Sequence, residues 1–308
     1  MNQKSTRVFT LTLLLLVFGV TQAFGQAIYD NIPNPFPGNL PSIAFEANQA
    51  EQFGDRVQFA GTSRTLTTAV QGMSSWGCQS GHWNTGDCLT TPGATFSHPI
   101  TLNLYNVASG NEVGSVIASV TQTFAIPYRP SADNTNCIGA DAGKWYHPAS
   151  ATCFNGLATT ITFNLAGLGI VVPNEVIYGI EYSTTHYGNP PVGESAPCYT
   201  SSGGCGYDSL NVLTTADPPT VGVNPAPDDA YFSSLTAANY CDGGAGGVGT
   251  FRLDAGCWTG FKPVVRFNAA NPPQSKDDCK NGGWMTRTTA TGEPFRNQGQ
   301  CVSYFNHQ

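Results

Sequence analysis

Hydrophobic and polar residues alternate most regularly between Ile100 and Tyr128. Ile100, Leu102 and Leu104 fall on one face at a period of two, and a polar link, Ser109–Asn111, follows them. The alternation then resumes, and the residues on one face of the second run are Val116, Ala118, Val120, Gln122, Phe124 and Ile126. A period of two predicts half-buried strands, and a short Ser-Gly-Asn link predicts an antiparallel hairpin.

Shorter segments with strand-like alternation lie on both sides of this hairpin. They cover residues 43–45, 55–60, 65–73, 159–165, 176–182, 209–214, 251–253 and 262–267. Glycine (35 residues) and proline (21 residues) are abundant, and long apolar segments with a period of 3.6 are missing. We therefore predict an all-β fold over residues 40–268, namely a two-sheet antiparallel β-sandwich of jelly-roll type with long disulfide-bridged loops.

The N-terminus predicts a secretory signal peptide over residues 1–25. Lys4 and Arg7 precede an apolar run, Val8–Val20, and small residues occupy the cleavage positions before Gln26. The run of about 13 residues is shorter than the roughly 20 that a membrane-spanning helix needs. We expect this segment to be removed. The mature chain is then predicted to be secreted, to the extracellular space or the periplasm, without membrane insertion.

Two further segments flank the predicted sandwich. Residues 26–39 are rich in proline and are predicted to form an extended lead-in. Residues 269–308 are predicted to form a linker and a small C-terminal tail bridged by one cysteine pair. The bridge is expected because so few residues cannot build a hydrophobic core of their own.

Composition and charge narrow the choice of partners. Charged residues make up only 11% of the chain, and its formal net charge is -7. Loss of the signal peptide removes Lys4 and Arg7 and no acid, which leaves a charge of about -9. Nucleic acid and anionic membranes repel a negative protein. We therefore expect neither as a partner.

All ten cysteines lie in the mature part of the chain, where a secreted protein holds them as disulfides. They are Cys78, Cys88, Cys137, Cys153, Cys198, Cys205, Cys241, Cys257, Cys279 and Cys301. We prefer pairing of successive neighbours because long strand-like runs separate the five pairs, although other connectivities stay open at this point. A zinc site is the alternative, but the C-x-x-C spacing that it requires is missing.

Two resemblances follow from short motifs. The motifs GDRVQFAG (54–61), ITLNLYNV (100–107) and VPNEVIYGIEY (172–182) resemble the β-sandwich modules of bacterial secreted and surface proteins called choice-of-anchor modules. The motifs CKNGGW (279–284) and FRNQGQCV (295–302) are similar to a cysteine motif at the ends of secreted bacterial proteins. The first resemblance implies a sandwich fold. Neither implies an activity or a catalytic residue.

All five tryptophans lie in or next to a cysteine-bounded loop. An exposed aromatic ring stacks on the apolar face of a sugar, and neighbouring polar groups fix the orientation of that sugar. The candidate ligand-binding residues are therefore Trp76, Trp83, Trp145, Tyr146 and Tyr187. The alternative is that each indole packs on its disulfide as a small core, as in immunoglobulin-like sandwiches.

Carboxylate side chains are weaker candidates for a functional site, either as calcium ligands or as catalytic groups. Asp228, Asp229 and Asp242 are candidate calcium ligands, because loops also supply the carbonyl oxygens that calcium takes. A solvated acidic loop is the alternative, and no other cofactor is expected. The motifs G-x-S-x-G, H-E-x-x-H and the P-loop are missing. A glycosidase needs two carboxylates at a set separation, and Glu181 with Glu175 or Glu194 could supply them, although any sequence offers such pairs.

Three functional hypotheses remain. The first is a secreted noncatalytic module that binds an extracellular glycan through loop aromatics, and it predicts exposed tryptophan or tyrosine side chains along a groove. The second is a structural or surface-associated protein that contacts other surface proteins, and it predicts buried tryptophans with an apolar patch or an open sheet edge. The third, less favoured, is a hydrolase, which requires catalytic groups that converge in a cleft.

Overall fold

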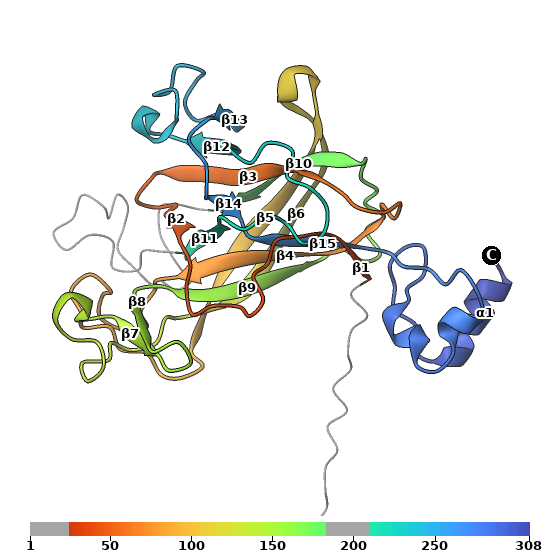
Figure 1. Ribbon diagram of the computed structural model, residues 1–308, viewed down its shortest axis with the longest axis horizontal. Helices are drawn as coiled ribbons and strands as arrows, with labels where there is room; N and C mark the ends of the chain where they lie inside the picture. The colour runs from red at the N-terminus through yellow and green to blue at the C-terminus, as the bar shows by residue number, and fades with distance from the viewer. Residues whose placement is uncertain (1–24, 183–209) are drawn as a thin grey trace, which may run out of the picture.

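The computed structural model describes residues 25–182 and 210–308. Strands dominate this part of the chain, and they form two antiparallel sheets that pack against each other (Figure 1). The predicted all-β antiparallel sandwich is therefore confirmed, whereas its jelly-roll type stays a prediction. Among the described helices, none is long and apolar enough to cross a membrane. Residues 1–24 of the predicted signal peptide lie outside the described residues.

The seven-stranded sheet has β4 at its centre. Its strands are β1 (Gln26–Asp30), β2 (Ser42–Ile43), β4 (Leu66–Ser75), β9 (Leu157–Asn164), β11 (Leu210–Thr215), β14 (Lys262–Pro263) and β15 (Val265–Ala269). One side of β4 pairs with β9, and the other side pairs with β15 and then with β11. β1 continues the sheet beyond β15, and β2 and β14 pair with β11.

The six-stranded sheet covers the other face of the core. Its strands, in spatial order, are β13 (Arg252–Ala255), β12 (Asp229–Ser234), β3 (Ala50–Gln58), β10 (Glu175–Glu181), β5 (Thr95–Val107) and β6 (Val113–Pro127). Short strands β7 (Trp145–His147) and β8 (Thr152–Phe154) form a separate hairpin. The short helices are η1 (Ser109–Asn111), η2 (Gly139–Asp141), η4 (Ala237–Asn239), η5 (Asp277–Cys279), η6 (Gly283–Thr286) and α1 (Gln298–Asn306).

The hydrophobic core lies between the two sheets and is built from alternate residues of the strands. The ring of Tyr178 on β10 lies 5.3 Å, between centroids, from that of Phe267 on β15. The ring of Phe124 on β6 lies 4.9 Å from that of Phe163 on β9. Each pair joins one sheet to the other, and large aromatic side chains contribute much of the buried apolar area.

The predicted hairpin is confirmed as β5 and β6, with η1 at its turn. Ile100, Leu102 and Leu104 are fully buried, as their alternation predicts. The hairpin lies at the edge of the six-stranded sheet, because β6 pairs with β5 and is last in the spatial order.

The prediction that Val116 faces the core with Ala118 is wrong. Leu104 pairs with Ala118, but the next residue, Tyr105, pairs with Val116, so Ile117 is an extra residue in β6. Such a β-bulge shifts the alternation of side chains by one position. Ile117 therefore packs against the core, and Val116 is 60% exposed.

A glutamine side chain connects the outer strand of one sheet to that of the other. Gln122 Nε2 on β6 donates to the carbonyl oxygen of Asn164 on β9 at 2.8 Å. The backbone N–H of Asn164 donates to Gln122 Oε1 at 3.1 Å. The carboxamide thus makes the pair of hydrogen bonds that a neighbouring strand would make, and it protects the edge of β9.

One of the two segments that flank the predicted sandwich joins its sheet, and the other has a core of its own. The proline-rich lead-in contains β1, whose pairing with β15 makes it part of the seven-stranded sheet from Gln26 onward. The C-terminal tail has a small core of its own, in which Trp284 and Phe295 pack against the disulfide between Cys279 and Cys301. Figure 1 shows this tail and β7–β8 at opposite ends of the molecule.

Neighbouring cysteines pair wherever the structure describes them. The four disulfides in the described residues join Cys78 to Cys88, Cys137 to Cys153, Cys241 to Cys257 and Cys279 to Cys301. The predicted pair of Cys198 and Cys205 lies outside the described residues. Disulfides of this number are typical of extracellular proteins.

Candidate functional site

Two disulfide-bridged loops meet at the end of the sandwich where β5 begins and β6 ends. The first loop, residues 76–94, connects β4 to β5 and contains the disulfide of Cys78 and Cys88. The second loop, residues 128–156, follows β6, contains β7 and β8, and holds the disulfide of Cys137 and Cys153. Because Thr95 pairs with Pro127 at the base of the hairpin, the two loops leave the sheet side by side.

The backbones of the two loops touch at a pair of glycines. Gly86 of the first loop has φ 76° and Gly143 of the second has φ 82°. Residues that carry a Cβ rarely adopt this left-handed backbone conformation. A Cβ on Gly143 would lie 2.6 Å from the Cα of Gly86, closer than carbon atoms approach each other. The contact therefore depends on glycine in both loops.

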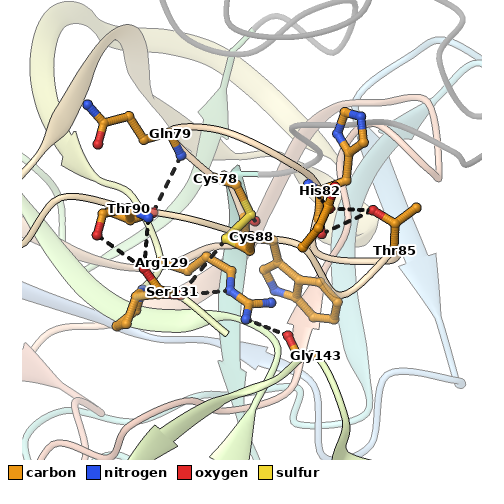
Figure 2. Close-up of a disulfide and its surroundings, with 12 residues drawn as sticks. Cys78, Gln79, His82, Thr85, Cys88, Thr90, Arg129, Ser131 and Gly143 are labelled. Carbon is orange, nitrogen blue, oxygen red and sulfur yellow. Dashed lines mark hydrogen bonds between the residues drawn. A yellow bond between two sulfur atoms is a disulfide. The ribbon is translucent and has the colours of Figure 1, made fainter. Parts of the chain in front are cut away.

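Arg129 ties two parts of the second loop together from inside the protein and reaches the first loop through its backbone (Figure 2). Its side chain is 0% exposed, its Nε donates to the carbonyl oxygen of Pro130 at 3.2 Å, and its Nη2 donates to that of Gly143 at 2.8 Å. Its backbone N–H donates to the carbonyl oxygen of Gly77 at 2.9 Å. Burial lowers the pKa of the guanidinium to about 10, so it is still charged at neutral pH.

A second set of hydrogen bonds links the loops near the surface. The backbone N–H of Thr90 donates to Ser131 Oγ at 2.9 Å, and that hydroxyl donates to the carbonyl oxygen of Thr90 at 3.2 Å. The backbone N–H of Ala132 donates to the carbonyl oxygen of Cys88 at 3.0 Å. Figure 2 shows Thr90 and Ser131 beside the disulfide of Cys78 and Cys88. The loops therefore form one rigid platform, which is the kind of support that a binding site requires.

A groove runs along the junction of the two loops. It consists of a larger hollow of about 690 Å³ and a smaller one of about 580 Å³, which share Thr90, Pro92 and Ser131. The larger hollow continues to Tyr128, Asp133 and Tyr146, and the smaller one continues to Gln79 and Leu89. Each volume lies within the range of roughly 300–1,000 Å³ that is usual for small-ligand sites.

The groove combines flat apolar surfaces with neutral hydrogen-bonding groups. Rings and prolines line it, and they are Pro92, Pro127, Tyr128, Pro130, Trp145 and Tyr146. Hydroxyl and amide groups stand between them, on Thr90, Ser131, Asn134 and Thr135. Among the described residues that line either hollow there is no lysine, arginine or histidine. This chemistry suits a ligand with apolar faces and many hydroxyl groups.

Asp133 is the carboxylate among the described lining residues. Its Oδ1 accepts from the backbone N–H groups of Thr135 at 2.9 Å and Asn136 at 2.8 Å, and its Oδ2 accepts from Asn136 Nδ2 at 2.9 Å. The Asn136 side chain, with the two backbone donors, lowers the pKa of Asp133 below its ordinary value. The carboxylate is therefore ionised at neutral pH and engaged by its own loop.

Two of the five candidate aromatic residues line this groove, and they line it differently. Trp145 is 4% exposed, its Nε1 donates to the carbonyl oxygen of Gly156 at 2.8 Å, and its ring lies 5.7 Å from that of Phe154. Its indole is thus packed into the wall. Tyr146 is half-buried, so part of its side chain is open to a ligand. Tyr146 fits the predicted exposed platform, whereas Trp145 fits the alternative of a small core.

The other three candidate aromatic residues do not line either hollow in the described structure. Trp76 and Trp83 are half-buried and pack edge to face on each other, with 4.7 Å between ring centroids. Trp76 Nε1 also donates to Ser74 Oγ at 3.0 Å. Tyr187 lies outside the described residues. The first loop therefore contributes its backbone, Thr90, Pro92 and Leu89 to the groove, and not its tryptophans.

The three candidate calcium ligands each have donors nearby in the protein. Asp228 accepts from Thr259 Oγ1 at 2.6 Å, and Asp229 accepts from the backbone N–H of Gly256 at 3.0 Å. Asp242 forms an ion pair with Arg252 at 2.8 Å. Among the described residues, the one group of three potential metal-binding side chains consists of Asp254 and the disulfide-bonded Cys241 and Cys257. The three candidate aspartates thus do not converge on one point in the described structure.

Tyr128, Asp133 and the prolines of the groove are not among the residues that the sequence pattern predicts for the site. The predicted hairpin already indicates where these residues lie. If β5 and β6 pair, the residues before β5 and those after β6 must lie together, and both segments are rich in proline and hydroxyl groups. Comparisons with protein-family models, with curated proteins and with solved structures found no match for this chain.

Proposed function

We propose that this protein is a secreted, noncatalytic module that binds an extracellular glycan in the groove between its two disulfide-bridged loops. The observation that carries the proposal is the lining of that groove, where Tyr128, Tyr146 and several prolines alternate with neutral hydroxyl and amide groups. Sugar rings offer an apolar face to aromatic side chains and hydroxyl groups to polar neighbours, so the two surfaces are complementary.

The rigidity of the platform supports binding. Two disulfides, the Gly86–Gly143 contact and the buried Arg129 hold the loops before any ligand arrives. A site that is already ordered loses less conformational entropy when it binds. A flexible pair of loops with the same side chains would bind more weakly.

The carboxylate chemistry of the groove supports a noncatalytic role. Glycoside hydrolysis generally uses two carboxyl groups, one of which has a raised pKa so that it can donate a proton. In the groove the described lining residues include the carboxylate of Asp133, whose pKa is lowered and whose oxygens accept three local hydrogen bonds. This group is suited to hold the loop and not to act as a general acid.

The test is binding of the mature chain, residues 26–308, to a panel of polysaccharides, followed by titration of any hit. Tyr146→Ala should weaken binding by roughly 5- to 30-fold, the usual effect of truncating a central aromatic contact. The matched control is Phe261→Ala, which truncates a 42% exposed aromatic side chain that does not line the groove. It should bind like the wild type. A blank panel with folded protein would refute the proposal and favour a structural role through protein contacts.

A further inference from the structure

The groove is longer than a site for one sugar requires. Its two hollows share Thr90, Pro92 and Ser131, so they adjoin at these three residues. Tyr146 lines one end and Leu89, which is 63% exposed, lines the other. Each hollow alone has the volume of an ordinary small-ligand site. Two such hollows in a row are suited to several consecutive units of one chain.

The charges around the groove select against acidic ligands. Asp133 is ionised, and the described lining residues include no cation that would offset it. Two cations of the second loop lie outside the lining: Arg129 is 0% exposed and donates to carbonyl oxygens of the protein, and Lys144 forms an ion pair with Asp141 at 2.7 Å. A carboxylate on the ligand would meet repulsion from Asp133 and no cation among the described lining residues. Asp133 already accepts three hydrogen bonds from its own loop, so it needs no cationic group on the ligand either.

We infer that the groove binds the interior of an uncharged polysaccharide chain, which lies across both hollows from Tyr146 to Leu89. The inference rests on the proposed function and adds the ligand class, namely a neutral chain bound along its length. Recognition of the chain ends is not needed, because the two hollows adjoin and Asp133 is the one charged group among their described lining residues. Contact with both hollows makes affinity depend on the number of sugar units.

Chain length is tested with a ladder of oligosaccharides, from one to six units, prepared from the neutral polysaccharide that binds best in the panel. Affinity should rise at least tenfold between two units and six. Leu89→Ala should weaken binding of the six-unit ligand several-fold and leave the two-unit ligand unchanged, whereas Tyr146→Ala should weaken both. The backbone pairing of Leu89 with Ser80 does not involve the side chain, so the variant keeps the loop intact. Equal affinity for one unit and six would overturn the inference.

Charge selectivity is tested with one uronic-acid polymer before and after chemical reduction of its carboxyl groups, because the two polymers share linkage and shape. A carboxylate held near Asp133 in water should weaken binding about fivefold per close contact. The reduced polymer should therefore bind at least fivefold more tightly. In Asp133→Asn this difference should shrink, because the charge is gone while the amide oxygen still accepts from the backbone N–H groups of Thr135 and Asn136. The side-chain amide of Asn136, which donates to the second carboxylate oxygen, must turn its own oxygen toward the new NH2 group.

The outcomes separate the inference from the function on which it rests. Tighter binding of the acidic polymer than of its reduced form would overturn the inference and leave glycan binding in place. Binding of neutral chains that Tyr146→Ala does not weaken would show that the site lies elsewhere, which overturns both. Failure of every polysaccharide to bind would also overturn both.

Discussion

The contact between Gly86 and Gly143 gives the sharpest test of how the groove is held together. Gly143→Ala would place a Cβ 2.6 Å from the Cα of Gly86, and the hydrogen bond from Arg129 Nη2 to the carbonyl oxygen of Gly143 holds this backbone in place. The matched control is Gly139→Ala in the same loop. Gly139 also has a positive φ, of 63°, but a Cβ there would meet nothing within 4 Å.

The expected difference in the free energy of unfolding follows from a comparison of the two variants. An alanine in the left-handed region costs about 1–2 kcal/mol, and each variant incurs this cost. Both substitutions also restrict the unfolded chain to the same extent, so that effect cancels in the difference. Forcing an extra carbon into a packed contact adds about 1–3 kcal/mol in Gly143→Ala alone. We therefore expect Gly143→Ala to be less stable than Gly139→Ala by about 1–3 kcal/mol.

Two measurements report on this difference. Urea unfolding with the disulfides intact gives the free energy of unfolding of each variant. Native-state hydrogen exchange of the Thr90 and Ala132 amides, which donate across the junction of the loops, reports local opening that leaves the sandwich folded. Both amides should exchange faster in Gly143→Ala than in Gly139→Ala. If the two variants agree within about 0.5 kcal/mol and exchange alike, the glycine contact does not position the loops.

Three further predictions concern the sandwich and the tail. Burial raises the pKa of Asp55 well above its ordinary value of 3.8. The folded state therefore holds the proton more tightly than the unfolded state does, and the free energy of unfolding should fall as pH rises from about 4 through the folded pKa. Asp55→Asn should flatten this fall in melting temperature between pH 4 and pH 8, and parallel profiles for the two proteins would contradict the assignment. Gln122→Ala removes both hydrogen bonds to the backbone of Asn164 and should cost about 1–2 kcal/mol in urea unfolding. A loss below about 0.3 kcal/mol would show that the side chain does not join the sheets. Replacing Cys279 and Cys301 by serine opens a loop with a sequence separation of 22 residues and removes about 3 kcal/mol of stabilisation from the tail. Limited proteolysis should then cut the tail while the melting temperature of the sandwich stays unchanged, and a lower melting temperature would mean that the tail supports the sandwich.

The hairpin shows how far alternation predicts this fold. Ile100, Leu102 and Leu104 are buried as predicted, because a strand that pairs regularly keeps its period of two. The prediction fails at Val116, where one extra residue in β6 reverses the alternation. A bulge depends on the fit between two strands, and the pattern of one strand does not contain that information.

The lead-in shows a second limit of the sequence pattern. Residues 26–30 have no strong alternation and are followed by prolines, so their sequence predicts an extended segment outside the sandwich. In the structure they form β1, whose pairing partner β15 lies more than 230 residues later in the chain. Pairing over such a separation follows from the packing of the whole domain, because only the folded sandwich brings the two segments together.

The candidate site was predictable in its location and not in its members. Long cysteine-bounded loops with aromatic residues were expected to carry the function, and the groove lies between two of them. The sequence could not show that Trp145 packs into the wall while Tyr146 is half-open, because adjacent residues with similar chemistry differ only in the direction of their side chains. It also gave no weight to Arg129, whose role rests on carbonyl oxygens that any residue carries.

The sequence by itself therefore determined the fold class and the hairpin, and it favoured the pairing of neighbouring cysteines that the described loops show. These properties depend on local periodicity, turn residues and spacing, which can be read along one chain. Only the tertiary structure decided which loops touch, that Gly86 meets Gly143, and that two adjoining hollows lie at the junction, with no cation among their described lining residues. Those properties come from contacts between segments that lie tens of residues apart, and such contacts form only when the two sheets have packed.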